Sequence, residues 1–432
     1  MVLLLTSFMS FFMRVNSFVF VIPLLGVWIS YLMSNDFYFN QIYSNLFMND
    51  ELSLFMVYMT VFVLFISYVY SLYLKEWFSI NLTFLFMFLF CYGVFVSSNL
   101  FSLYFFYESS LLPILYIIVK WGSYPERSLS AMMLLIYTSI FTFPFMFVLF
   151  YYYYINSSFS LFPIYSSTFV SLKGLACFIV FVTFAVKLPI YGLHFWLPMA
   201  HVEAPTFGSM ILAGVLLKLG GVGLIRCAPF FKFPLMSEYL LSYLMVFMLY
   251  VTVVCLFQSD FKRLVAYSSV THMMAVPILL LSNNLMSMKS ILMVMLFHGL
   301  SSPILFMLVG VIYSIFSSRQ LLLIRGLTLT SPLLSFLMVL AFLFTLSAPP
   351  FPSFVAEVFF LVSSFCLSSY FIFVFIVFTF FSLLYNLNWL SAMVFSSATT
   401  SNMSTMLSYS AFMPISLAFV FCVPLSCLTF MM

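Results

Sequence analysis

Long apolar runs recur along almost the whole chain and are separated by short polar gaps. Six of them carry about 20 apolar residues each, enough to cross ~30 Å of hydrocarbon as a helix. They lie at 53–74, 79–98, 129–152, 237–258, 369–390 and 409–430. A transmembrane barrel would instead alternate apolar and polar residues over strands of roughly 10 residues, and this chain does not.

The remaining apolar stretches predict helices at 100–119, 169–196, 207–228, 262–282 and 288–316, and a broken one at 327–366. One or two more in the first 33 residues bring the total to 13 or 14. The polar gaps are too short for a soluble domain and contain no low-complexity linker. We therefore expect an all-α polytopic membrane protein in which residues 1–432 form a single membrane domain.

Composition agrees with this interpretation. The 432 residues are 65% hydrophobic and 6% charged, whereas an ordinary soluble domain is roughly 25% charged. Mean hydropathy is +1.23. The seven cysteines form no C-x-x-C pair and mostly lie inside apolar runs, so we interpret them as small packing residues.

Five ionisable residues lie inside the apolar segments: Glu108, Lys187, Lys218, Glu357 and His272. An ionised side chain at the bilayer centre costs a few kcal/mol or more, so a helix that keeps one usually lines an ion or proton path. These five residues are the leading candidates for function.

Prolines accompany the first two candidates. Glu108 lies one turn before Pro113, and Pro189 and Pro198 predict an interrupted helix around Lys187. Interrupted helices at membrane depth line cavities and build ion sites in transporters. The alternatives are an interhelical hydrogen bond for the carboxyl group and snorkelling to the interface for the lysine.

Lys218 shares a helical face with Gly214 and Gly221. Small residues there let helices approach closely and could leave room for an ammonium group and water. Packing alone explains the glycines but not the lysine.

Two histidines continue the series. Ser268 and Ser269 precede His272 by one turn, and hydroxyls beside an imidazole resemble a proton relay. His298 precedes a Gly, Ser and Pro cluster that should loosen its helix. Either histidine, taken alone, is equally well explained as a hydrogen-bonded structural residue.

Glu357 follows prolines at 349, 350 and 352, which predict a second helix break, as at Lys187. Glu108 precedes Lys187 by 79 residues, and His272 precedes Glu357 by 85. This matching order suggests two structural repeats, as in transporters built from inverted halves.

His194, His201 and Glu203 could be proposed as metal ligands. The two histidines lack the i, i+4 spacing of a helical zinc site, and Pro198 lies between them, so polar contacts at the end of the broken helix are favoured. His194 is a further candidate for the relay. No dinucleotide, Walker A, haem or iron–sulfur motif occurs, so any redox chemistry belongs to another subunit.

Charges in the loops and at the ends of the predicted helices indicate an orientation. One side collects Lys75, Lys120, Arg127, Lys262, Arg263, Arg319 and Arg325, and the other collects Lys173, Arg226, Lys232 and Lys289. Seven against four favours the first side as the matrix or cytoplasmic face, by the positive-inside rule.

Several motifs together resemble one known family. They are YESSLLPILYIIVKWGSYPER, HFWLPMAHVEAPT, QSDFKRLVAYSSVTHM, FHGLSSPILF and PPFPSFVAEVF. They look like the subunit 4 family of mitochondrial NADH dehydrogenase, which are antiporter-like membrane subunits of respiratory complex I. The resemblance spans roughly residues 80–390, and H-x-W-L-P-x-A-H-x-E-A-P-T separates it from the related subunits 2 and 5. One departure is Met199, where the family often carries a charged or polar residue.

The resemblance implies about 14 transmembrane helices with two inverted five-helix repeats, each holding a discontinuous helix, and one proton channel. It implies N-terminal helices in 1–75, antiporter-like repeats in 79–228 and 237–392, and a C-terminal helix in 393–432. By the same resemblance Glu108 pairs with Lys187, Lys218 bridges the halves, His272 and His298 lie on the central axis, and Glu357 titrates in the second half-channel.

The resemblance further implies the mitochondrial inner membrane and neighbouring membrane-arm subunits, including related antiporter-like ones. NADH, FMN, iron–sulfur clusters and ubiquinone would be bound by other subunits, with no cofactor or metal on this chain. Lipids such as cardiolipin are candidate ligands, and nucleic acid is not expected.

We therefore expect a proton-translocating subunit coupled to quinone reduction elsewhere. Moving the charge of Glu108 away from Lys187, or restoring it, would change the proton affinity of the lysine and pass its proton toward Lys218 and Glu357. One rival is a stand-alone antiporter whose lysines and carboxylates bind sodium or potassium in competition with protons. The other is a purely structural membrane scaffold.

Overall fold

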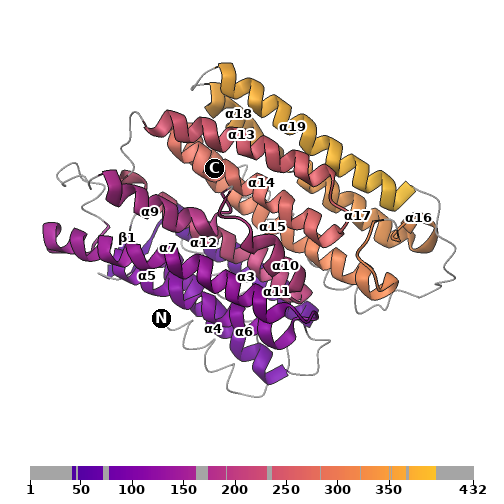
Figure 1. The fold of residues 1–432 in the computed structure, drawn as a ribbon, viewed down its shortest axis with the longest axis horizontal. Helices are drawn as coiled ribbons and strands as arrows, with labels where there is room; N and C mark the ends of the chain where they lie inside the picture. Colours follow the sequence, from indigo (N-terminus) through magenta and orange to yellow (C-terminus); the bar gives the residue numbers. More distant parts are fainter. Residues whose placement is uncertain are drawn as a thin grey trace.

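The structure, a computed structural model, consists almost entirely of helices (Figure 1). It describes residues 41–44, 47–71, 77–161, 174–190, 192–230, 236–282, 284–321, 323–349, 351, 353–365 and 369–395. The helices predicted in the first 33 residues and at 409–430 lie outside the described residues. Within them, the strands β1 (Gln41–Ser44) and β2 (Phe47–Asn49) form a short antiparallel pair, and the rest bears out the all-α prediction.

The helices follow the apolar runs closely. The first group is α3 (Glu51–Ser71), α4 (Trp77–Val96), α5 (Leu100–Ser109), α6 (Leu111–Trp121) and α7 (Arg127–Asn156). The middle group is α9 (Gly174–Lys187), α10 (Trp196–Glu203), α11 (Thr206–Ile211), the π turn η1 (Leu212–Leu216), α12 (Leu217–Arg226) and η2 (Ala228–Phe230). The last group is α13 (Met236–Leu256), α14 (Phe261–Ser282), α15 (Leu285–Phe316), α16 (Leu327–Thr330), α17 (Pro332–Thr345), α18 (Ser353–Phe365), α19 (Ser369–Leu390) and η3 (Ser391–Phe395). In the described ranges, nine helical stretches are long and apolar enough to cross a membrane.

Both predicted helix interruptions are present. Helix α9 ends at Lys187 and α10 begins at Trp196, whose indole N–H donates to the Val186 carbonyl at 3.0 Å. This bond satisfies one of the carbonyls that a helix end leaves free. Similarly, α17 ends at Thr345 and α18 begins at Ser353. Pro198 lies in the first turn of α10, where a proline removes no intrahelical amide bond, so the two prolines accompany a single interruption.

The helices form one bundle, in which the early helices of the chain lie on one side and the last helices on the opposite side (Figure 1). Helices α3 to α7 lie on one side, α19 lies at the opposite edge, and α14 and α15 run between them. Helix α15 contacts α14, α18, α11 and α3 and is buried along most of its length. The stretch Thr206–Arg226 is buried even more completely. These two segments carry Lys218 and His298, which places both residues in the core.

Gly220 is required where α12 crosses α9. A Cβ atom there would lie 2.9 Å from both the Leu188 amide nitrogen and the Phe184 carbonyl oxygen, which are backbone atoms. Gly220→Ala should therefore push the two helices apart and lower the stability of the folded chain by about 1–3 kcal/mol, as overpacking does. Thermal unfolding of the assembled protein measures this loss. Gly174→Ala is the matched control, because a Cβ at Gly174 meets no described atom within 4 Å, and equal stability of the two variants would contradict the expectation.

Candidate functional site

Lys187 lies at the end of α9 with its side chain buried against α5. Its ammonium group donates to the Tyr107 carbonyl at 2.8 Å and lies 3.3 Å from the centre of the Tyr107 ring. Glu108 is the next residue along α5 and interacts electrostatically with Lys187. Its Oε1 is buried and has no hydrogen-bond partner, and no ion pair joins the two side chains in the part of the chain that the structure describes. The two candidates are thus neighbours, and the lysine ammonium group is bound by Tyr107.

Lys218 is fully buried at the start of α12, directly after the π turn η1. Its ammonium group donates to the Ala213 carbonyl inside that turn at 2.6 Å and lies 2.7 Å from Nδ1 of His298 on α15. A π turn widens a helix locally and often marks a functional site. The structure therefore joins two predicted candidates, from α12 and α15, in a direct side-chain contact.

The glycines beside Lys218 serve close packing. A Cβ at Gly214 would approach Val63 to 2.6 Å and Pro303 to 2.9 Å, and one at Gly221 would overlap the sulfur of Met295. The expectation that small residues let the helices approach is confirmed. The space beside the two glycines is filled by these apolar side chains.

His272 on α14 extends the contact. Its ring centre lies 5.9 Å from that of His298 and 6.2 Å from that of Phe378 on α19. Its Nε2 is buried and has no hydrogen-bond partner among the described residues. The hydroxyls of Ser268 and Ser269 donate to carbonyls of α14 itself, at 2.9 and 2.6 Å. Lys218, His298 and His272 are thus consecutive neighbours.

Glu357 lies in the first half of α18, just beyond the second interruption. It interacts with the Ser347 side chain, and Ser347 has the left-handed φ of 50° within the break. Tyr385 on α19 lies close to Glu357 and to Thr271, the residue before His272, and its fully buried hydroxyl has no hydrogen-bond partner among the described residues. Tyr385 was missed from the sequence, because one tyrosine among 27 carries no distinguishing signal.

The two histidines weighed as metal ligands pack against aromatic rings. The His194 ring lies 4.7 Å from the Phe195 ring and 6.3 Å from the Tyr267 ring. The His201 ring stacks on Phe306 at 4.7 Å. No group of three metal-binding side chains is found in the part of the chain that the structure covers.

Lys262 was counted as a loop charge, and this was wrong. It is buried in the first turn of α14, where its ammonium group donates to the Ala204 carbonyl at 2.5 Å and the Val202 carbonyl at 3.2 Å. Arg319 also donates to the Val202 carbonyl at 3.2 Å. Burial raises the pKa of Glu203, which lies beside them at the end of α10 and outside the long spans. A cluster of charges therefore holds the end of α10.

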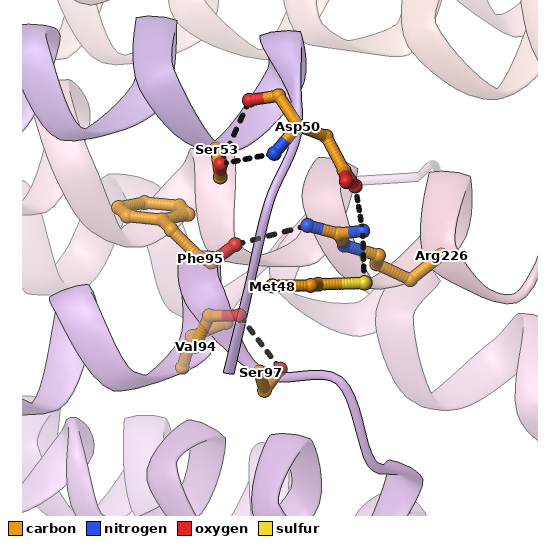
Figure 2. A network of polar contacts seen from close by, with 7 residues as sticks. All are labelled: Met48, Asp50, Ser53, Val94, Phe95, Ser97 and Arg226. Atoms are coloured by element: carbon orange, nitrogen blue, oxygen red, sulfur yellow. Dashed lines mark hydrogen bonds and ion pairs between the residues drawn. The ribbon is translucent and has the colours of Figure 1, made fainter. Parts of the chain in front are cut away.

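Arg226 was likewise counted as a loop charge, yet it is 3% exposed at the end of α12. Figure 2 shows its guanidinium between three elements: it pairs with the Asp50 carboxylate, donates to the Phe95 carbonyl at 3.1 Å and approaches the Met48 sulfur at 3.3 Å. Asp50 in turn is held by Ser53, whose hydroxyl accepts from its amide and donates to its carbonyl, both at 2.8 Å. Removing Lys262 and Arg226 from the loop count leaves six charges against three, so the predicted orientation is unchanged.

Comparison with known proteins shows which family this chain resembles. Residues 97–384 match the family described as NADH:quinone oxidoreductase/Mrp antiporter, TM. Proteins named NADH-ubiquinone oxidoreductase chain 4 are similar to this chain, from Locusta migratoria at 40% identity over 69% of this chain and 67% of that one, and from Lumbricus terrestris at 37% over 62% and 61%. The chain thus spans about three fifths to two thirds of the length of these relatives.

Solved structures share the fold. A chain of respiratory complex I from Thermus thermophilus, solved with bound NADH, superposes with a TM-score of 0.83 at 20% identity, over 97% of this chain and 94% of that one. A chain of the Mrp complex from a Dietzia species gives 0.79 at 15% identity, over 88% and 81%. The predicted class of polytopic helical protein with discontinuous helices is confirmed. With two thirds of its length inside the matching family, the chain belongs to the NADH:quinone oxidoreductase/Mrp antiporter membrane family, in the branch of NADH-ubiquinone oxidoreductase chain 4.

Proposed function

We propose that this chain is a proton-translocating membrane-arm subunit of NADH:ubiquinone oxidoreductase, respiratory complex I, in the mitochondrial inner membrane. The observation that carries the proposal is the buried contact between Lys218 and His298, with the His272 ring next in line. A buried lysine in contact with an imidazole can exchange a proton with it near neutral pH. Electron transfer from NADH to ubiquinone takes place on other subunits, which bind NADH, FMN, iron–sulfur clusters and ubiquinone, and this chain binds no cofactor.

In the proposed mechanism, Glu108 controls Lys187. A carboxylate close to a lysine favours its protonated form, so moving Glu108 or its charge away lowers the proton affinity of Lys187. The released proton passes through water to Lys218, to His298 and His272, and on to Glu357, with His194 as a further candidate on the way. The two halves, residues 79–228 and 237–392, each contribute one helix interruption to this path, at Lys187 and before Glu357.

The proposed partners are the other membrane-arm subunits, including the related antiporter-like ones. Apolar side chains exposed on the outer helices, such as Phe147 on α7 and Phe373 on α19, suit burial against these subunits or lipid. Exposed Arg127 and Arg263 suit the phosphate groups of anionic lipids such as cardiolipin.

Purified complex in sealed vesicles tests the proposal. We expect NADH oxidation to acidify one side in a sodium- and potassium-free buffer, and Lys187→Met to lose most of this pumping, because methionine fills the lysine site without carrying a proton. The readout is protons moved per electron pair, measured alongside NADH oxidation. Lys120→Met, which changes an exposed lysine, is the control.

Each rival function makes a different prediction in this assay. A stand-alone cation/proton antiporter would purify as an active oligomer away from the large complex and would require sodium or potassium. A structural scaffold would pump normally with Lys187→Met. Either result would overturn the proposal.

A further inference from the structure

Tyr107 forms a binding site for the Lys187 ammonium group, made of its carbonyl and its ring. Its carbonyl accepts a hydrogen bond from Nζ at 2.8 Å, and its ring lies 3.3 Å from the same atom. Both residues are almost fully buried, so no bulk water competes for the charge. A cation over a desolvated aromatic ring is among the stronger contacts of this kind.

The ring is fixed in place by α9 itself. The Tyr107 hydroxyl donates to the Thr183 carbonyl at 3.1 Å, and the ring packs edge-on against Phe184 at 5.3 Å. Thr183 and Phe184 precede Lys187 by about one turn, so all three residues face α5 from one side of α9. The Tyr107 ring therefore stays aligned with the Lys187 ammonium group.

The break between α5 and α6 helps to form the binding site at the Tyr107 carbonyl. Helix α5 ends at Ser109 and α6 begins at Leu111, and the Ser110 hydroxyl donates to the Tyr107 carbonyl at 2.7 Å. This carbonyl is therefore polarised by one side chain while it accepts a hydrogen bond from Lys187. Glu108, next along the chain, has a buried oxygen without a partner among the described residues, so a second position for the ammonium group lies beside the first.

We propose that Tyr107 is a positioning residue that holds the Lys187 ammonium group whenever the lysine is not paired with Glu108. The inference rests on the proposed function and deepens it by naming the state that alternates with the ion pair. A ring and a carbonyl stabilise an ammonium group without a negative charge, so the lysine keeps its proton yet remains able to release it. Among the described residues, Glu108 and the Cys91 thiol on α4 are the other titratable groups that interact with Lys187. On α12, which also packs against α9, Lys218 and Arg226 are engaged with His298 and Asp50 instead.

Removing the ring tests the inference. In purified complex in sealed vesicles, Tyr107→Leu should shift the alkaline limb of the pH profile of pumping toward acid by about one pH unit, because the unpaired ammonium group loses its aromatic partner. Tyr107→Phe keeps the ring and loses only the hydroxyl, and it should restore the parental profile. Tyr107→Met is a second ringless variant with a flexible side chain that fills irregular gaps.

Two further variants make the outcome decisive. Tyr152 is also a fully buried tyrosine, packed edge-on against Phe230, and no described lysine lies over its ring, so Tyr152→Leu should leave the pH profile in place. If the ringless variants pump with the same pH profile as Tyr107→Phe, the inference fails. Should Lys187→Met still lose pumping in that case, the proposed function stands and only the role of Tyr107 is wrong. If Lys187→Met pumps normally, the proposed function itself fails.

Discussion

Lys218→Met is expected to abolish proton pumping while the complex still assembles. Lys218 is fully buried, and its ammonium group is shared between the Ala213 carbonyl and His298. Methionine fills a similar volume without a charge, and it leaves no opposite charge unpaired, because the partners of Lys218 are a carbonyl and an imidazole. A positioned group that transfers a proton contributes roughly 10²–10⁴-fold to a rate, so we expect pumping to fall by at least about 100-fold.

Vesicles that contain the purified complex give the measurement, as protons moved per second at a fixed rate of NADH supply. Lys289→Met is the matched control, because Lys289 is exposed on α15, the same helix that carries His298. His298→Leu should reproduce the loss, since it removes the other half of the contact. Normal pumping by Lys218→Met would remove the central member of the proposed path.

The three buried lysines in the described part of the chain share one arrangement, and it explains how the membrane interior tolerates them. Lys187 donates to a carbonyl beside the α5–α6 break, Lys218 to one inside the π turn, and Lys262 to one at the end of α10. Carbonyls at helix ends and irregular turns lack their usual amide partners. Each interruption therefore supplies uncharged acceptors, which stabilise an ammonium group and leave its proton affinity to be controlled by a neighbouring carboxylate or imidazole.

Much of this architecture could be predicted from the sequence. Apolar runs located the helices because a span has a minimum length, and the prolines near Lys187 and before Glu357 located the two interruptions because proline cannot donate an amide proton. The candidates inside those runs were found because charge is costly there. The contact of Lys218 with His298 brings together residues 80 positions apart, and the sequence could name both residues but not the bond.

Other parts could not be predicted, for physical reasons. Lys262 and Arg226 lie at helix ends, where a linear pattern does not distinguish a loop from a buried turn packed under another helix. The π turn leaves no signature in composition. The contact of Lys187 with Tyr107 depends on which face of α5 meets α9. Packing among many similar aromatic side chains decides which face this is.

Asp50→Asn is expected to lower the stability of the chain strongly. The substitution keeps the shape of the side chain but leaves the buried Arg226 guanidinium without a counter-charge (Figure 2). Breaking a buried pair in this way costs about 3–5 kcal/mol, and we expect about 3 kcal/mol because the Asp50 side chain is 24% exposed. The loss should appear as earlier thermal unfolding and lower yield of assembled complex, since this pair ties β2 and the start of α3 to α4 and α12.

The double variant Asp50→Asn with Arg226→Met should recover most of the lost stability, because methionine leaves no charge in the core and fills the space beside Met48. Asp260→Asn is the control: its partner Arg263 is 55% exposed and lies 3.4 Å away, and a surface pair of this kind contributes roughly 0–1 kcal/mol. If Asp50→Asn unfolds at the same temperature as Asp260→Asn, the pair adds nothing to the fold. If the double variant is less stable than Asp50→Asn alone, Arg226 acts through its contacts with Phe95 and Met48 rather than through its charge.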